Sequence, residues 1–151
     1  MLKEVFTAKP VSSNLETTAA IIPKVSDRPV PKKLLQCKSE LQQLAIQFLD
    51  ACEKQGISVC IYYGFRTHDE QAALYAQGRT TPGKIVTNAK PGQSAHETGN
   101  AFDAAPFVNG KIDWNSNLFD TMGPIGESVG LVWGGRFKSI VDKPHYQLPT
   151  K

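Results

Sequence analysis

The sequence predicts an α+β fold in which helices pack on a small, mostly antiparallel sheet. Two observations carry this prediction. Helical patterns come early in the chain, and short runs rich in β-branched and aromatic residues, separated by turn signals, come mostly later. The chain has 151 residues, of which 40% are hydrophobic and 21% are charged. This is enough for one substantial core in an ordinary globular protein.

The chain is expected to begin with an irregular arm and to continue with a long helix. Residues 1–33 are rich in Ser, Thr, Pro and Lys, and four prolines interrupt any periodic pattern. Apolar residues then follow the i, i+3, i+4 spacing of one buried helix face until Gly56 ends the pattern. They are Leu34, Cys37, Leu41, Leu44, Ala45, Phe48, Leu49 and Cys52. We therefore expect an arm over 1–33, a domain over 34–151 and a first helix over 34–55.

A strand, a second helix and a long loop are predicted next. Residues 57–63 are rich in β-branched and aromatic side chains and indicate a strand. Thr67 and Glu70 have the spacing of a capping box, which starts a helix that stops at Gly78. The loop over 79–95 contains two Pro-Gly pairs, and loops of this length are usually functional or disordered.

The remaining elements are mostly strands. Residues 100–105 indicate a strand, and Asn109-Gly110 is a strong hairpin signal. A helix over 115–129 is expected to be disturbed by Gly123-Pro124. The Gly134-Gly135 pair then turns the chain into a last strand-like segment over 137–148.

Charge and hydropathy exclude some classes of protein. The net charge of +3 is too small to indicate an anionic polymer such as nucleic acid or cell wall. The longest apolar run near the start has four residues and ends at Pro23, far short of the roughly 20 that a spanning helix needs. No signal peptide follows Lys3 and Glu4. We expect no nucleic-acid partner and no membrane insertion. The protein should be cytoplasmic, with reduced cysteines, until another system releases it.

Two short motifs supply the candidate site: residues 94–103 (Ser-Ala-His-Glu-Thr-Gly-Asn-Ala-Phe-Asp) and residues 142–145 (Asp-Lys-Pro-His). A catalytic zinc ion takes three protein ligands and leaves a fourth position for water. His96, Asp103 and His145 would be the ligands, and Asp142 would stand free beside the metal as a base. Zinc lowers the pKa of its bound water to about 7, and a free carboxylate can pass that water's proton to a leaving amine. This combination hydrolyses amides.

Strand geometry supports the same arrangement. His96 would lie on a loop, Gly99 would turn the chain, and Asp103 would lie on the strand that follows. Alternation along that strand points Asp103 to the cleft and Phe102 to the core. Pro144 restricts the backbone just before His145.

The two motifs resemble those of zinc peptidases related to D-alanyl-D-alanine carboxypeptidases (VanY-like), and most closely those of the L-alanyl-D-glutamate endopeptidases of phage endolysins and their bacterial relatives. The resemblance spans about residues 34–149. It includes the segments 63–67 (Tyr-Gly-Phe-Arg-Thr), 70–71 (Glu-Gln), 74–79 (Leu-Tyr-Ala-Gln-Gly-Arg), 86–89 (Val-Thr-Asn-Ala) and 134–135 (Gly-Gly).

The resemblance implies a hedgehog/D,D-peptidase-like fold with a zinc cleft, and it implies the role of each site residue. His96, Asp103 and His145 would bind zinc, and Asp142 would be the catalytic base. Arg66 would stabilise the oxyanion. Ser94 would form a hydrogen bond either with the substrate or with one of the residues that bind zinc. Two simpler interpretations stay open: Arg66 could pair with Asp69 or Glu70, and Ser94 could be a loop cap.

The resemblance also implies a function, which is zinc-dependent cleavage of peptidoglycan stem peptides between L-alanine and D-glutamate. The enzyme would be a monomer that a holin-type pore releases to the cell wall. The D,D-carboxypeptidase relatives usually carry Glu at the base position, so Asp142 favours the L-alanyl-D-glutamate branch. Two alternatives remain. One is a D,D-carboxypeptidase or dipeptidase acting on D-alanine termini, and the other is a non-catalytic, zinc-containing wall-binding module.

Overall fold

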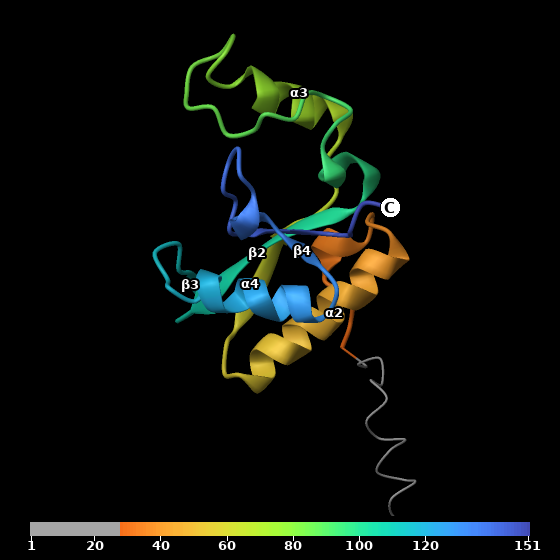
Figure 1. Cartoon of the computed structure of the whole chain (residues 1–151), viewed down its shortest axis with the longest axis vertical. Coiled ribbons are helices and arrows are strands. Elements are labelled where there is room, and N and C mark those ends of the chain that lie inside the picture. The colour runs from red at the N-terminus through yellow and green to blue at the C-terminus, as the bar shows by residue number, and fades with distance from the viewer. Residues whose placement is uncertain (1–27) are drawn as a thin grey trace, which may run out of the picture.

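The computed structural model describes residues 28–151 (Figure 1). Over these residues the chain forms one five-stranded sheet, two helices that pack against it, and a third helix in a separate lobe, which confirms the predicted α+β fold. The elements are η1 (Lys32–Leu34), α2 (Ser39–Lys54), β1 (Val59–Tyr63), α3 (His68–Ala76), η2 (Ala95–Thr98), β2 (Ala101–Val108), β3 (Lys111–Ile112), α4 (Phe119–Ser128), β4 (Val132–Trp133), η3 (Gly134–Arg136) and β5 (His145–Gln147).

Strand β2 lies at the centre of the sheet. The strand order is β1-β2-β5-β4, with β3 paired to the far end of β2, and every pair is antiparallel. The β2–β3 hairpin turns at Asn109 and Gly110, which adopt φ of 53° and 81°, as the Asn-Gly signal predicts. Among residues 28–151, no helix is both long and apolar enough to cross a membrane.

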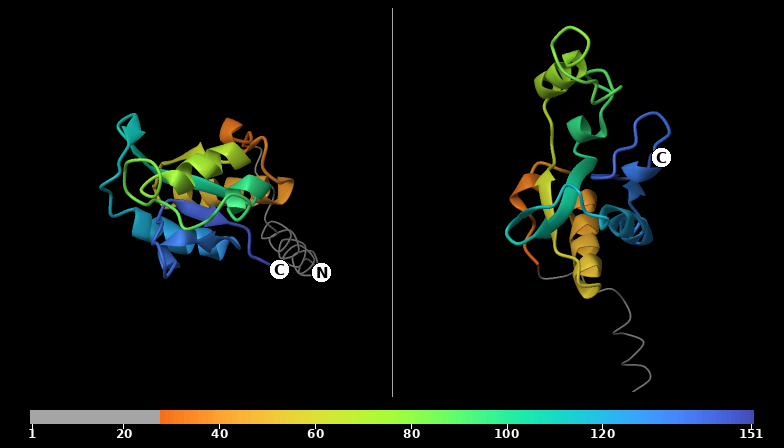
Figure 2. Two further views of the ribbon diagram at one scale, coloured as in Figure 1. Left: turned by 90° about the horizontal axis from the view of Figure 1, so that it is seen from above. Right: turned by 90° about the vertical axis from the view of Figure 1, so that its left-hand side faces the viewer.

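The core lies between one face of this sheet and the helices α2 and α4 (Figure 2). Phe102 pairs with Tyr146, and Tyr146 pairs with Trp133, so three aromatic residues form one row across three strands. Phe48 of α2 packs on this row, with its ring centroid 4.6 Å from that of Tyr146 and 6.0 Å from that of Phe102. Helix α4 comes so close that a Cβ atom at Gly126 would lie 2.6 Å from the ring of Tyr146.

The first helix begins later than its apolar stripe predicts. It starts at Ser39, because Lys38 is extended with φ −60° and ψ 145°. Leu34 and Cys37 are buried, as the stripe requires, but Leu34 ends the short 3-10 helix η1 and Cys37 lies in the turn that follows it, before α2. The side-chain amide of Gln42 donates to both of their carbonyl oxygens, at 3.0 and 2.9 Å, and so satisfies the turn. The predicted helix over 34–55 was therefore wrong at its start.

The C-terminal prediction was also wrong in extent. A strand-like segment was expected over 137–148, but only His145–Gln147 forms a strand. Gly134–Arg136 forms a short 3-10 helix, and residues 137–144 are irregular. Pro144 has no N–H to contribute to a ladder, and the His145 N–H turns back to the Asp142 carbonyl at 3.1 Å.

Several other elements agree with the sequence. Helix α3 begins with the predicted capping box, in which Thr67 and Glu70 exchange side-chain to backbone hydrogen bonds. The helix predicted over 115–129 exists, but its prediction was wrong in two respects. Helix α4 starts only at Phe119, because residues 114–118 form turns in which Ser116 Oγ accepts the Leu118 N–H, and it runs unbroken through Gly123-Pro124 to Ser128. Most of the predicted arm, residues 1–27, lies outside the described residues. Where the description begins, Arg28 pairs with Asp50 and Glu53 of α2.

Helix α3 and the loop that follows it form a lobe at the end of the molecule away from α2 and α4 (Figure 1). Strand β1 leads into this lobe and η2 leads out of it, back to β2. The lobe is therefore joined to the sheet at the end where His96 and Asp103 lie.

Candidate metal centre

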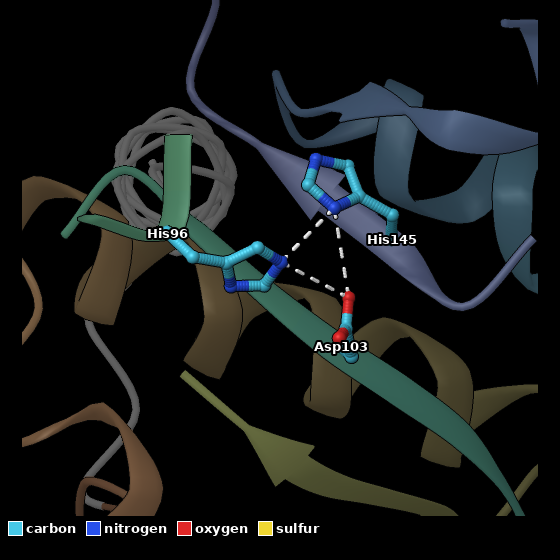
Figure 3. Close-up of side chains that lie close together, drawn as sticks. All are labelled: His96, Asp103 and His145. Carbon is cyan, nitrogen blue, oxygen red and sulfur yellow. Dashed lines mark hydrogen bonds and ion pairs between the residues drawn. The ribbon is translucent and has the colours of Figure 1, made fainter. Parts of the chain in front are cut away.

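Three side chains from separate elements converge on one point (Figure 3). His96 comes from η2, Asp103 from β2 and His145 from β5. His96 Nε2 lies 3.2 Å from His145 Nδ1, and Asp103 Oδ1 lies 3.4 Å from the former and 3.6 Å from the latter. Because Phe102 faces the helices, alternation places Asp103 on the opposite face of the sheet.

Local sequence explains how His96 and Asp103 meet. The Ser94 hydroxyl accepts a hydrogen bond from the His96 backbone N–H at 3.2 Å, and the Glu97 carboxylate accepts the Ser94 N–H at 3.0 Å. This capping box forms the short helix η2. Gly99 then adopts the left-handed conformation, with φ 71°, and reverses the chain into β2. Ser94 therefore caps η2, as the simpler of the two interpretations of this residue predicted.

Hydrogen bonds outside the triad decide which ring nitrogen of each histidine faces inward. His96 Nδ1 lies 2.8 Å from the Gly64 carbonyl oxygen, which can only accept, so Nδ1 carries the proton. His145 Nε2 lies 2.8 Å from Gln147 Oε1 and carries its proton for the same reason. The other two ring nitrogens present lone pairs toward Asp103. Three acceptor atoms that face one another form a site for a cation.

The electrostatics of Asp103 support this inference. Its Oδ1 atom is buried and has no hydrogen-bond partner in the described part of the chain. Burial favours the neutral carboxyl, but the neighbouring His145 and His96 outweigh burial and hold the pKa of Asp103 well below its usual range. The pKa of His145 is raised, since Asp103 and Gln147 outweigh its burial. These three residues could hold a metal ion, and His145 would then have to be neutral, with Nδ1 free of a proton.

Asp142 lies beside this centre without belonging to it. Its Oδ2 atom is 3.9 Å from His145 Nδ1, and its side chain is 47% exposed. Burial and the charge of Asp103 raise the pKa of Asp142 above its ordinary value. A carboxylate whose pKa is moved toward neutrality is a better proton acceptor than an ordinary surface aspartate.

The turn that carries Asp142 is held by the segment just before it. Trp133 Nε1 donates to the Lys143 carbonyl at 2.8 Å, and the Asp142 N–H donates to the Gly134 carbonyl at 2.9 Å. A Cβ atom at Gly134 would overlap the Asp142 carbonyl oxygen, so only glycine permits this approach. Gly134 therefore positions Asp142, although the sequence predicted only a turn at Gly134-Gly135.

Arg66 faces the same cleft from the lobe. Its guanidinium lies over the Tyr63 ring, 4.7 Å from the centroid, and its Nη1 donates to Gln71 Oε1 at 2.9 Å. The sequence had left open a pairing of Arg66 with Asp69 or Glu70. In the structure its guanidinium contacts Tyr63 and Gln71 instead. Gln71 is fully buried, and its Nε2 donates to the Ala89 carbonyl at 2.8 Å. One buried amide thus links α3, Arg66 and the loop of the lobe.

The centre opens into a cleft of about 380 Å³. Leu74 and Val86 of the lobe line one part of it, and Phe137 and Ile140 of the irregular C-terminal segment line another. All six residues predicted for the site line this cleft: Arg66, Ser94, His96, Asp103, Asp142 and His145. Their individual roles remain predictions.

Sequence reasoning missed the residues that orient the site. Gln147 lies two positions after His145 on the same strand, so alternation along β5 could have identified it. Gln71 and the Gly64 carbonyl belong to segments that the resemblance includes, but no local pattern assigns them a role. His68, whose side chain is 68% exposed, contacts Glu97 rather than the cleft. Trp133 and Tyr146 are core residues.

Two imidazoles and a buried carboxylate around one point, with a second carboxylate free beside them, are characteristic of metal-dependent peptidases. The chain belongs to one family of such enzymes, the D-alanyl-D-alanine carboxypeptidase (VanY) family, which matches residues 34–130. The matched region contains Arg66, His96 and Asp103, and it ends before Asp142 and His145.

Three known proteins show the similarity further. The chain is 35% identical over 139 residues to the peptidoglycan L-alanyl-D-glutamate endopeptidase CwlK of Bacillus subtilis (strain 168), covering 82% of this chain and 78% of that protein. It is 38% identical over 84 residues to an L-alanyl-D-glutamate peptidase of Escherichia phage T5, covering 56% of this chain and 55% of the relative. The fold is similar to that of a vancomycin-resistance D,D-pentapeptidase VanY variant in complex with Zn(II), with a TM-score of 0.57, 15% identity, and coverage of 82% of this chain and 84% of that one.

We expect Gln71→Leu to loosen the lobe without unfolding the domain. The change leaves the Ala89 carbonyl and Arg66 Nη1 without their buried partner, which costs about 1–3 kcal/mol of unfolding free energy. Trypsin should then cut faster after Arg79 and Lys84. Gln43→Leu, at an exposed position of α2, is the matched control and should change neither property. Equal cleavage rates in both variants would show that Gln71 does not anchor the loop.

Proposed function

We propose that this chain is a zinc-dependent peptidoglycan endopeptidase that hydrolyses the bond between L-alanine and D-glutamate in stem peptides. The observation that supports it most strongly is the centre itself, in which three inward-facing acceptor atoms meet beside a free carboxylate. The choice of bond follows the two relatives whose names specify it.

The spacing of the three atoms suits zinc. Zinc lies about 2.0–2.2 Å from His nitrogen and carboxylate oxygen, so two ligands of a tetrahedral ion are about 3.4 Å apart. The three separations between His96, Asp103 and His145 are 3.2, 3.4 and 3.6 Å. A VanY protein of similar fold is described with Zn(II), in agreement with this choice of metal.

The residues around the centre divide the chemistry among them. A bound zinc ion supplies a Lewis acid, which polarises the scissile carbonyl and acidifies a water molecule. Asp142 accepts the proton of the attacking water and then donates it to the amine nitrogen of the leaving D-glutamate. Arg66 stabilises the negative charge that develops on the carbonyl oxygen. Ser94 accepts the His96 N–H, which leaves its own hydroxyl proton to donate to the substrate.

A second candidate is a D,D-carboxypeptidase or dipeptidase acting on D-alanine termini, because the family as a whole bears that description. The shorter base, Asp142, argues against it. A wall-binding module that does not cleave its ligand needs no base, so the position of Asp142 in the cleft argues against that alternative too.

Mass spectrometry of digested muropeptides tests the proposed bond directly. Purified protein with zinc should release stem peptides that begin with D-glutamate and leave L-alanine on the sugar. Free D-alanine with intact L-alanyl-D-glutamate bonds would establish the carboxypeptidase instead.

Metal content separates the ligands from the base. The chain should hold about one zinc ion. His145→Ala should lose both zinc and activity, whereas Asp142→Asn should keep zinc and lose about 10²–10⁴ in rate, the usual contribution of a general base. Elemental analysis and peptide release measure both properties. Full zinc occupancy in His145→Ala would contradict the ligand assignment, and loss of zinc in Asp142→Asn would make Asp142 a ligand.

Similarity to a phage peptidase supports one proposal about delivery. We propose that the chain acts as a monomer on the wall after a holin-type pore admits it. Expression alone should then cause little lysis, and co-expression of a holin, or addition of a permeabilising agent, should cause rapid lysis measured by turbidity. Efficient export of the lone chain, detected by fractionation of intact cells, would contradict pore-dependent release.

A further inference from the structure

An exposed aromatic surface lies at the β3 end of the sheet and has no role in the proposed chemistry. Trp114 follows β3, is 57% exposed, and packs edge-on against Tyr62 of β1 with ring centroids 5.3 Å apart. Phe107, near the end of β2, is 37% exposed. We call these three residues, Tyr62, Phe107 and Trp114, the aromatic surface.

The segment that presents Trp114 is held by hydrogen bonds on both sides of it. The Asp113 N–H donates to the Pro106 carbonyl of β2 at 2.9 Å. The Asn115 N–H donates to Asp113 Oδ1 at 3.2 Å, and the Ser116 N–H donates to the Asp113 carbonyl at 3.3 Å. A large apolar ring is thus held in an ordered position while more than half of it faces solvent. Such a ring is suited to contact a ligand.

The aromatic surface and the metal centre lie along the same face of β2. Asp103 and Phe107 project from the same face of β2, because they are four residues apart on one strand, which is about 13 Å. Tyr62 directly precedes Tyr63, which pairs with Asp103 between β1 and β2.

The opposite end of the cleft has different chemistry. There a groove of about 680 Å³ continues past Ser94 and Gln147 toward Lys38 and Asn100. Ser94 and Gln147 line both spaces, so the groove and the cleft adjoin. The lining of this groove is mostly polar and carries both signs of charge, from Lys38, Lys151 and Glu40, which suits a charged peptide, whereas the aromatic surface suits an apolar or ring-shaped ligand.

The proposed substrate has the same asymmetry. In peptidoglycan, L-alanine is joined through a lactyl group to a muramic acid ring, and D-glutamate leads into the rest of the peptide. The sugar therefore begins roughly two residue lengths, about 7 Å, from the scissile carbonyl. An enzyme that cuts this bond in the intact wall must accommodate a sugar near its metal.

We propose that the aromatic surface formed by Tyr62, Phe107 and Trp114 is a subsite for the muramoyl sugar of the glycan strand. The inference rests on the proposed function. It orients the substrate, with the glycan toward β3 and the glutamyl side of the peptide toward the groove at Lys38. The apolar face of a sugar ring packs on Trp114, which holds the first residue of the stem peptide over the metal.

Paired substrates test the subsite. A disaccharide-tetrapeptide and the same tetrapeptide without sugar are compared in wild type, Trp114→Ala and Trp114→Phe. Wild type should prefer the sugar-bearing substrate in kcat/KM. Trp114→Ala should lose about tenfold on that substrate, equivalent to one well-packed ring contact, and nothing on the free peptide. Trp114→Phe should retain most of the preference, and Val132→Ala, at an exposed apolar position on the edge strand β4, should retain all of it.

The outcomes separate the subsite from the function. Cleavage of both substrates with the same preference in wild type and Trp114→Ala would overturn the subsite and leave the endopeptidase intact. Cleavage of neither substrate would overturn the proposed function, and fluorescence then decides the subsite. A saturable change in tryptophan emission on titration with the disaccharide-tetrapeptide supports the subsite if wild type shows it and Trp114→Phe, which retains only Trp133, does not. Unchanged emission in wild type, or an equal change in both proteins, refutes it.

Discussion

The pairing register of β2 with β5 is the constraint on which both the core and the metal centre depend. Phe102 pairs with Tyr146 on the helix side, and the next pair, Asp103 with His145, faces the cleft. Because side chains alternate along a strand, a slip of one residue would turn the ionisable pair into the core and the aromatic rings into solvent. Burial of each ring contributes roughly 1.5–3 kcal/mol, so the hydrophobic effect holds the two ligands in register.

Strand β5 has only three residues, and its position therefore needs support beyond the ladder. Trp133 supplies that support, because its ring belongs to the core while its Nε1 donates to the Lys143 carbonyl. The Gly134 carbonyl adds a second bond, to the Asp142 N–H. Packing of one aromatic residue in the core thus determines where the proposed base stands, and this explains why an irregular segment can carry a precisely placed carboxylate.

How much could be predicted from the sequence depended on how local the interaction was. His96 and Asp103 lie in one motif with its own cap and turn, so their proximity followed from short-range geometry. Contacts between distant segments were not predictable in this way. The Gly64 carbonyl orients a ring 32 positions later, and Gln71 binds a carbonyl 18 positions later. No periodic pattern records such a pair, because each depends on how the lobe folds back on the sheet.

The same reasoning explains the two wrong boundaries. Leu34 and Cys37 continue the apolar stripe of α2, but burial is all that such a stripe records. Their backbone is not α-helical, and the Gln42 side chain donates hydrogen bonds to their carbonyl oxygens. Hydrogen bonds from a side chain to the backbone produce no periodic pattern in the sequence, so the later start of the helix could not be predicted. The segment 137–144 contains strand-forming residues. A longer β5 would have to pair with the end of β2 at Phe107 and Val108, and β3 already pairs there.

The lobe and the metal centre are held as one unit, and this bears on how the site responds to its substrate. The Gly64 carbonyl accepts from the His96 ring, and two residues later the Arg66 N–H donates to the His96 carbonyl at 3.1 Å. The segment that begins the lobe therefore binds one proposed ligand at both its ring and its backbone. Movement of this segment would move the His96 ring out of its position in the candidate metal centre. The position of the cleft wall near Arg66 and the orientation of the His96 ring are therefore coupled, and a substrate that shifts one also shifts the other.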